Sequence, residues 1–199
     1  INKDFYSSPL KRSSLAGGYI LSAYAIGVIF SVVAFIFAEI YIVIYGGTLL
    51  PFLSALKLFG VILLSVLASS AMVFFFVSFI KSQTAFGTVS TIVGTLVGFL
   101  TGVYMPIGIL PAAVQAVVKV FPVSHAAVLF RQIMLEAPMK TAFAGAPAEV
   151  VTKFKVENGV VLKYGSYESD WVLSLLVLVA TTVVFYGLAV LSVSRKKKG

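Results

Sequence analysis

The chain has 199 residues, of which 60% are hydrophobic and 11% are charged, and its formal net charge is +8. Soluble domains carry about 45–50% apolar and about 25% charged residues, so lipid rather than water must solvate most of this chain. Cysteine is absent, which excludes disulfides, thiolate metal sites and a cysteine nucleophile from this chain. The one histidine, His125, has no carboxylate at helical spacing, so we expect no metal site.

Four apolar stretches dominate the chain. They run over about 16–45, 58–80, 84–104 and 171–193. Because about 20 helical residues cross the hydrocarbon of a bilayer, each stretch is long enough for a transmembrane helix. Glu39 is the only acidic residue within these stretches. The sequence therefore predicts an all-α integral membrane protein with four transmembrane helices.

Basic side chains gather beside one set of helix ends. Alternation of four spans places both tails, 1–15 and 194–199, on one side together with the link between the second and third spans. That side holds Lys3, Lys11, Arg12, Lys81, Arg195 and the lysines 196–198, against Asp4 alone. The positive-inside rule then predicts a multi-pass protein of the cell membrane with both ends in the cytoplasm. The net charge reflects this topology and the pull of anionic lipid, so we expect no nucleic-acid partner.

The stretch 105–136 is apolar but interrupted by prolines. The breaks fall at Pro106, Pro111 and Pro122. The remaining pieces, 111–121 and 124–135, are each too short to cross a bilayer, and Ser124 is the expected N-cap of the second. Short apolar helices joined by proline at a membrane edge indicate a re-entrant hairpin in the outer leaflet.

The stretch 137–170 turns polar and is predicted to be an extracellular loop. Asn158-Gly159 separates two partly alternating segments, 150–157 and 160–164. Asn-Gly between such segments is a strong signal for a two-residue hairpin turn. We therefore expect a small extracellular β-hairpin centred on this pair.

Glycines recur at four-residue spacing in the third span, at Gly94, Gly98 and Gly102. This spacing places small residues on one helix face, where another backbone can approach closely. One interpretation is a tight contact near a translocation path. The other is ordinary helix packing.

Three polar residues stand out in apolar surroundings. Glu39 lies about 10 Å below the outer end of its predicted helix. A carboxylate there is costly unless paired or hydrated, which makes Glu39 a candidate for a pathway residue; alternatively the helix ends early and Glu39 lies at the headgroups. For His125 and Arg131, in the predicted hairpin, we favour structural roles, with Arg131 capping carbonyls or meeting lipid phosphate.

The N-terminal segment mixes aromatic and charged residues. Phe5, Tyr6 and Leu10 could insert into a groove on a cytoplasmic partner, as aromatic anchors do, or the segment could lie on the headgroups. The sequence holds no G-x-x-x-x-G-K-[ST] phosphate loop, so any ATP hydrolysis must belong to another chain or to a part of the protein outside this one.

Three sequence blocks, taken in chain order, resemble the permease of type 2 ATP-binding-cassette (ABC) exporters. The first block is DFYSSPLKR at 4–12, leading into Gly18-Tyr19-Ile20. The second is YMPIGILP at 104–111 with Val114-Gln115, and the third is FPVSHAAVLFRQIM at 121–134. The resemblance covers most of the chain except the polar loop 137–170.

The resemblance implies a larger assembly. Members of the family have six spans, a cytoplasmic coupling helix between the second and third, and re-entrant helices before the last. Two permeases pair, and two cytoplasmic ATPase subunits or domains, which carry the ATP and Mg²⁺, drive them. On this mapping the chain is the last four spans, with Phe5, Tyr6, Leu10, Lys11 and Arg12 in the coupling region, and it begins inside a longer protein, consistent with its lack of an initiator Met.

The function expected from this resemblance is export. The chain would be the permease, itself without a cofactor and not an enzyme, moving a drug (a multidrug role), lipid, peptide or glycan out of the cytoplasm. Two alternatives stay open at this point. One is an intramembrane enzyme using Glu39 and His125 as an acid–base pair, and the other is a non-catalytic scaffold or sensor.

Overall fold

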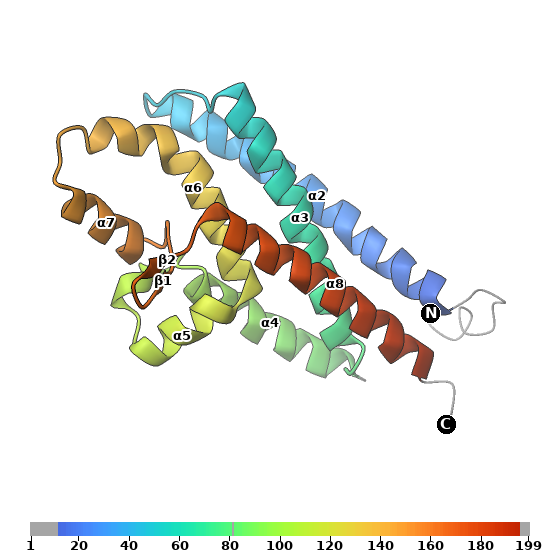
Figure 1. Ribbon diagram of the computed structural model, residues 1–199. Coiled ribbons are helices and arrows are strands. Elements are labelled where there is room, and N and C mark those ends of the chain that lie inside the picture. The colour runs from blue at the N-terminus through green and yellow to red at the C-terminus, as the bar shows by residue number, and fades with distance from the viewer. Residues whose placement is uncertain (1–11, 81, 196–199) are drawn as a thin grey trace.

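The computed structural model describes residues 12–80 and 82–195. It is almost entirely helical (Figure 1). The long helices are α2 (Arg12–Ile44), α3 (Phe52–Val77), α4 (Gln83–Leu100), α6 (Pro122–Ala142) and α8 (Trp171–Arg195). The short elements are η1 (Ile107–Ile109), α5 (Ala112–Val120), α7 (Ala148–Glu157), β1 (Lys163–Tyr164) and β2 (Tyr167–Glu168).

Within the described residues, four helices are long and apolar enough to cross a membrane. They are Gly17–Ile44, Phe52–Val77, Gln83–Leu100 and Trp171–Ser192, and the bent pair α5–α6 would make a fifth if it counts as one span. These helices match the four predicted stretches, with shifted boundaries. The second begins at Phe52 rather than 58, directly after Pro51, because Lys57 can extend its ammonium group to the interface without ending the helix. The third ends at Leu100 rather than 104.

The helix ends fall into two groups (Figure 1). The start of α2, the end of α3, the start of α4 and the end of α8 lie at one end of the molecule, which we call the terminal end. The α2–α3 link, α7 and the end of α6 lie at the other, which we call the loop end. This arrangement is the alternation that the four predicted spans require.

The helix α3 lies at the centre of the bundle and contacts α2, α6 and α8. Its core contacts use small and branched residues: Val61 and Ala68 pack with Ala126, Leu129 and Leu178. Gly27 of α2 lies so close to α3 that an added Cβ would sit 2.6 Å from Val66 Cγ1. Because lipid gives no hydrophobic drive between helices, such small residues and the close backbone approach they permit hold the bundle together.

The helix α4 is terminated by a glycine. Gly102 has φ +70°, and the amides of Gly102 and Val103 donate to the carbonyls of Phe99 and Gly98 at 3.1 and 3.0 Å. This is the Schellman pattern, in which a left-handed residue after the helix satisfies its last carbonyls. The helix itself has few partners within the chain, since Gly98 is its only buried residue.

The pair α5–α6 has the predicted re-entrant shape, with an 84° bend between its helices. The predicted N-cap Ser124 is wrong, because α6 begins two residues earlier with Pro122 in its first turn. Proline suits that position, where its missing N–H costs no hydrogen bond. The helix also continues past 135 to Ala142, through an exposed Pro138.

The predicted position of the β-hairpin is also wrong. Residues 148–157 form the helix α7, and Gly159 with φ +65° follows it, so Asn158-Gly159 ends a helix instead of joining strands. The i,i+4 spacing of Glu149, Lys153 and Glu157 supports that helix. A two-strand hairpin does exist a few residues later, where Gly165-Ser166 joins β1 to β2 in the register Lys163↔Glu168.

Candidate functional site

His125 lies at the junction between the re-entrant pair, α8 and the hairpin, with only 1% of its surface exposed. Its Nε2 lies 3.0 Å from the Lys119 carbonyl, and its Nδ1 lies 3.2 Å from the Ser174 hydroxyl. A carbonyl can only accept, so Nε2 carries the proton and Nδ1 accepts from Ser174. The histidine therefore joins α5, α6 and α8 as a neutral hydrogen-bonding residue.

Tyr164 of the hairpin completes this junction. Its hydroxyl donates to the same Lys119 carbonyl at 2.7 Å. Burial raises the pKa of the Tyr164 phenol, so the group stays protonated and keeps its role as a donor at neutral pH. The hairpin is thereby tied to the C-terminus of α5.

Arg131 connects α6 to two tight turns. Its Nη2 donates to the Gly102 carbonyl at 2.9 Å, and an added Cβ on Gly159 would lie 3.2 Å from its Nη1. The next residue, Gln132, donates to the Val160 carbonyl at 3.0 Å. These contacts hold the ends of α4 and α7 against one face of α6, as the structural role expected for Arg131 requires.

The three prolines named from the sequence each stand at the start of a helix. Pro106 precedes η1, Pro111 precedes α5, and Pro122 opens α6. Ser124 uses its hydroxyl to donate to the Leu100 carbonyl at 2.8 Å, which ties the start of α6 to the end of α4. The re-entrant pair is thus anchored to its neighbours by side chains that bond backbone carbonyls.

Glu39 lies near the end of α2 and contacts the link to α3. Its Oε2 accepts from the Leu50 amide at 2.9 Å, while its buried Oε1 has no partner among the described residues. At the same end of the helix, the ring centroids of Tyr41 and Tyr45 lie 4.4 Å apart, with the rings tilted by 35°. The carboxylate therefore ties the end of α2 to the α2–α3 link at the loop end. The helix does not end early, because α2 continues to Ile44, and a pathway role for Glu39 stays a prediction.

The glycines of the third span have three different surroundings. An added Cβ on Gly94 would meet nothing within 4 Å, whereas on Gly98 it would clash with the Tyr104 ring. Gly102 lies outside the helix, next to Ile107 and Arg131. Within this chain the three therefore form no common helix-packing face, and a contact with another chain remains a prediction for Gly94.

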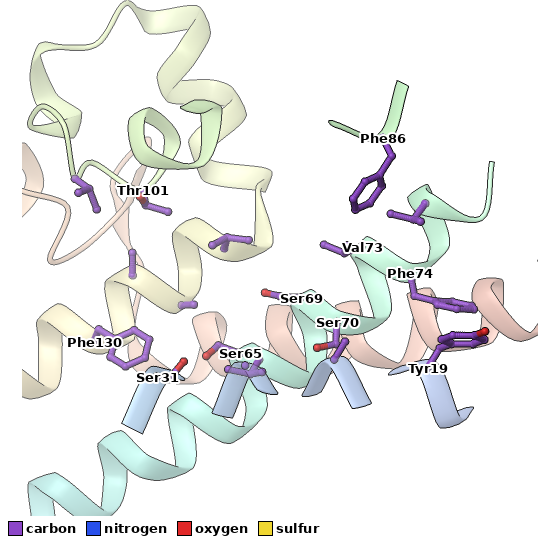
Figure 2. A pocket seen from close by; sticks show the side chains of 18 residues that line it. Tyr19, Ser31, Ser65, Ser69, Ser70, Val73, Phe74, Phe86, Thr101 and Phe130 are labelled. Carbon is purple, nitrogen blue, oxygen red and sulfur yellow. The ribbon is translucent and has the colours of Figure 1, made fainter. Parts of the chain in front are cut away.

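A lateral groove of about 710 Å³ runs between α2, α3, α4 and the re-entrant pair. Figure 2 shows its hydroxyl and aromatic side chains, which come from several elements. They are Ser31, Ser65, Ser69, Ser70 and Thr101, with Tyr19, Phe74, Phe86 and Phe130. We call it the serine groove. The hydroxyls of Ser31, Ser69 and Ser70 bond no other described residue, so they are available to a molecule in the groove.

A model of the ABC-2 family transporter proteins matches residues 2–191 of this chain. The chain belongs to the ABC-2 transporter family. No protein of curated function and no solved structure matches it. The match spans the first three predicted membrane helices, the fourth except for its last two residues, and the polar loop that the three sequence blocks do not cover.

Membership confirms the resemblance and the absence of an ATPase from this part of the protein. ABC-2 permeases are multi-pass membrane proteins that lack an ATPase domain; in this family ATP binds on separate ATPase subunits, with which the permeases generally pair. The intramembrane-enzyme alternative finds no support, because Glu39 bonds Leu50 while His125 bonds Ser174 and Lys119. No group of three metal-ligating side chains lies together in residues 12–80 and 82–195.

The residues predicted to couple this ABC-2 permease to an ATPase fall at or beyond the edge of the described structure. Phe5, Tyr6, Leu10 and Lys11 lie outside the described residues, and Arg12 is the first residue of α2. The partners of Ser124, Gln132 and Tyr164 were not predicted, since isolated polar residues in apolar sequence carry no signal of which carbonyl they meet. The prolines and glycines around them are the signal that marks this region as irregular.

Proposed function

We propose that this chain is the membrane-spanning part of an ATP-driven exporter with both tails in the cytoplasm. The observation that carries the proposal is the family match over residues 2–191. The geometry supports it, because the start of α2 and the end of α8 lie at the terminal end, where the sequence places its basic clusters. An ATPase subunit would bind at this end.

Coupling would follow from closure of the ATPases. ATP binding in the partner subunits pushes on the segment 1–15. The helix α2, which begins at Arg12 within that segment and has 33 residues, transmits the movement to the bundle. In this mechanism Phe5, Tyr6 and Leu10 dock on the ATPase, with Lys11 and Arg12 at the membrane edge. The chain itself holds no nucleotide.

The serine groove is the surface we assign to the transported molecule. It opens laterally, and α4, which borders it, leaves Val89, Ile92 and Leu96 exposed. A second permease copy packed on α4 would close the groove, with Gly94 at the contact. An apolar wall with hydroxyl groups favours an amphiphilic substrate. The substrate classes expected from the family resemblance are drugs, lipids, peptides and glycans.

The docking segment can be tested by separating assembly from coupling. In the complete protein, the double variant Tyr6→Ala with Leu10→Ala is expected to retain the ATPase on purification. Its transport-dependent ATP hydrolysis should fall about tenfold or more, because aromatic anchors contribute at least ~2 kcal/mol to a contact. Tyr45→Ala with Leu49→Ala is the matched control, because both residues are exposed at the loop end. Unchanged coupling in the first variant would remove the docking role.

A further inference from the structure

A second crevice lies between α3, α6 and α8, away from the serine groove. It encloses about 760 Å³, within the range of about 300–1,000 Å³ typical of ligand pockets. Its floor is apolar and is formed by Gly60, Val61, Leu129, Ile133 and Leu175. Gly60, Val61 and Leu175 lie on the membrane-spanning helices α3 and α8, so the floor is at the depth of acyl chains.

The mouth of this α3–α6–α8 crevice is polar. It is lined by Lys57, Gln132, Glu136 and Trp171. Trp171 is the first residue of a span and is 61% exposed, which is the usual place of tryptophan at the interface between hydrocarbon and headgroups. The crevice thus changes from apolar to polar at the depth where a lipid does.

A neighbouring cavity of about 540 Å³ continues the mouth toward the loop end and shares Gln132, Glu136 and Trp171. It adds Lys140, Lys155 and Asp170 to the charges of the mouth.

The two acids of this region already have partners. Glu136 pairs with Lys140 at 2.9 Å, and Asp170 accepts from the Leu173 amide at 2.8 Å, which caps α8. Lys57 and Lys155 form no ion pair with any residue in the part of the chain described. Lys57 nevertheless lies close enough to Glu136 to interact with its charge. Lys57, Lys140 and Lys155 outnumber Glu136 and Asp170, so the mouth carries a net positive charge.

We propose that the α3–α6–α8 crevice binds one anionic glycerophospholipid of the leaflet at the loop end. An acyl chain lies along the floor beside Gly60, and the phosphate lies at the mouth beside Lys57. A free phosphate ion would leave the apolar floor without a partner, and an apolar helix would leave Lys57 buried and unpaired, which is costly. The bound lipid would hold α6 against α3 and α8, and this role is independent of the transported substrate and of the direction of transport.

The floor can be blocked without disturbing the fold. An added Cβ on Gly60 would meet nothing within 4 Å, and leucine favours a helix more than glycine does, so Gly60→Leu fills the crevice while keeping α3. Gly187→Leu is the matched control, since Gly187 of α8 also has open space around it and does not line the crevice. Native mass spectrometry of the complete, detergent-purified protein with added dioleoylphosphatidylglycerol is the measurement.

We expect one retained phosphatidylglycerol in the parent protein and in Gly187→Leu, and about a tenfold loss of affinity in Gly60→Leu. Lys57→Gln should weaken phosphatidylglycerol about fivefold, while Lys163→Gln, at an exposed hairpin position, should have no effect. Dioleoylphosphatidylcholine should bind more weakly and should lose less affinity in Lys57→Gln, because its choline group balances the charge of its phosphate.

Three results would overturn the proposal. Equal retention in the two glycine variants would place the lipid elsewhere. Full displacement by sodium phosphate would make the site one for a free anion, and absence of any retained lipid would mean that another protein segment fills the crevice. None of these measurements needs ATP or an ATPase subunit, so their failure is distinct from failure of the exporter proposal.

Discussion

His125 lies buried where α5, α6 and α8 meet. As the only histidine, it was a candidate for chemistry, but its two ring nitrogens are both used, one on Ser174 and one on Lys119. The sequence could not predict this, because Ser174 lies 49 residues away and nothing local links the two.

His125→Ala is expected to lower stability by about 1–2 kcal/mol, because it leaves the buried Ser174 hydroxyl and Lys119 carbonyl with fewer partners. The thermal midpoint in detergent measures this, with Ser166→Ala in the exposed hairpin turn as the control. Transport per folded molecule should be retained. A variant with parental stability and no transport would instead give His125 a direct role in the pathway.

Glu39 can be tested with a substitution that keeps its geometry. In Glu39→Gln the side-chain carbonyl can still accept from the Leu50 amide, so stability and transport should remain close to those of the parent. Glu39→Leu removes the acceptor and should lower the free energy of unfolding in detergent by about 1–3 kcal/mol. Loss of transport in Glu39→Gln at unchanged stability would show that the charge itself acts in the pathway.

At the scale of elements, the same residue pattern had two structural meanings. Asn158-Gly159 matches the hairpin signal, yet Gly159 ends α7 with the amides of Gly159 and Val160 bonded back to Val156 and Lys155. Both a hairpin turn and a helix end need a residue with positive φ, so the dipeptide alone does not separate them. The helical charge spacing of 149–157 was the better guide.

The C-terminal end of α4, at Gly102, gives a prediction with a control in the same helix. Gly102→Ala combines a left-handed φ with a Cβ only 2.8 Å from Ile107 Cγ1, so it should destabilise the protein by about 1–3 kcal/mol. Gly94→Ala has open space in the interior of α4 and should be neutral or stabilising by up to about 1 kcal/mol. Thermal unfolding of the two variants compares them directly, and equal midpoints would contradict the assigned role of Gly102.

At the scale of the whole molecule, hydropathy predicted the spans because each must be apolar along about 20 residues to lie in lipid. The spans and the re-entrant bend followed from this requirement and from the positions of Pro111 and Pro122. Which helix packs on which did not follow, because apolar residues lie on all sides of α2, α3 and α8, with only scattered polar ones, and lipid does not distinguish a packed face from an exposed one. The serine groove and the α3–α6–α8 crevice depend on that packing.

Membrane orientation is the property on which the exporter proposal depends, and the absence of cysteine makes it measurable. Lys163→Cys adds a thiol to an exposed position of the hairpin, and Gly199→Cys adds one to the tail outside the described residues. In intact cells a membrane-impermeant maleimide should label the protein only through position 163. Label at position 199 should require permeabilisation.

The parent protein measures any background from cysteines elsewhere in the complete polypeptide. A membrane-permeant maleimide should label both variants, which shows that both thiols are reactive. The reverse pattern, with position 199 labelled from outside intact cells, would place the basic tail on the wrong side for a cytoplasmic ATPase. Since α2 begins and α8 ends at the same end of the bundle, that result would also move the coupling segment 1–15 outside and exclude ATP-driven coupling through it.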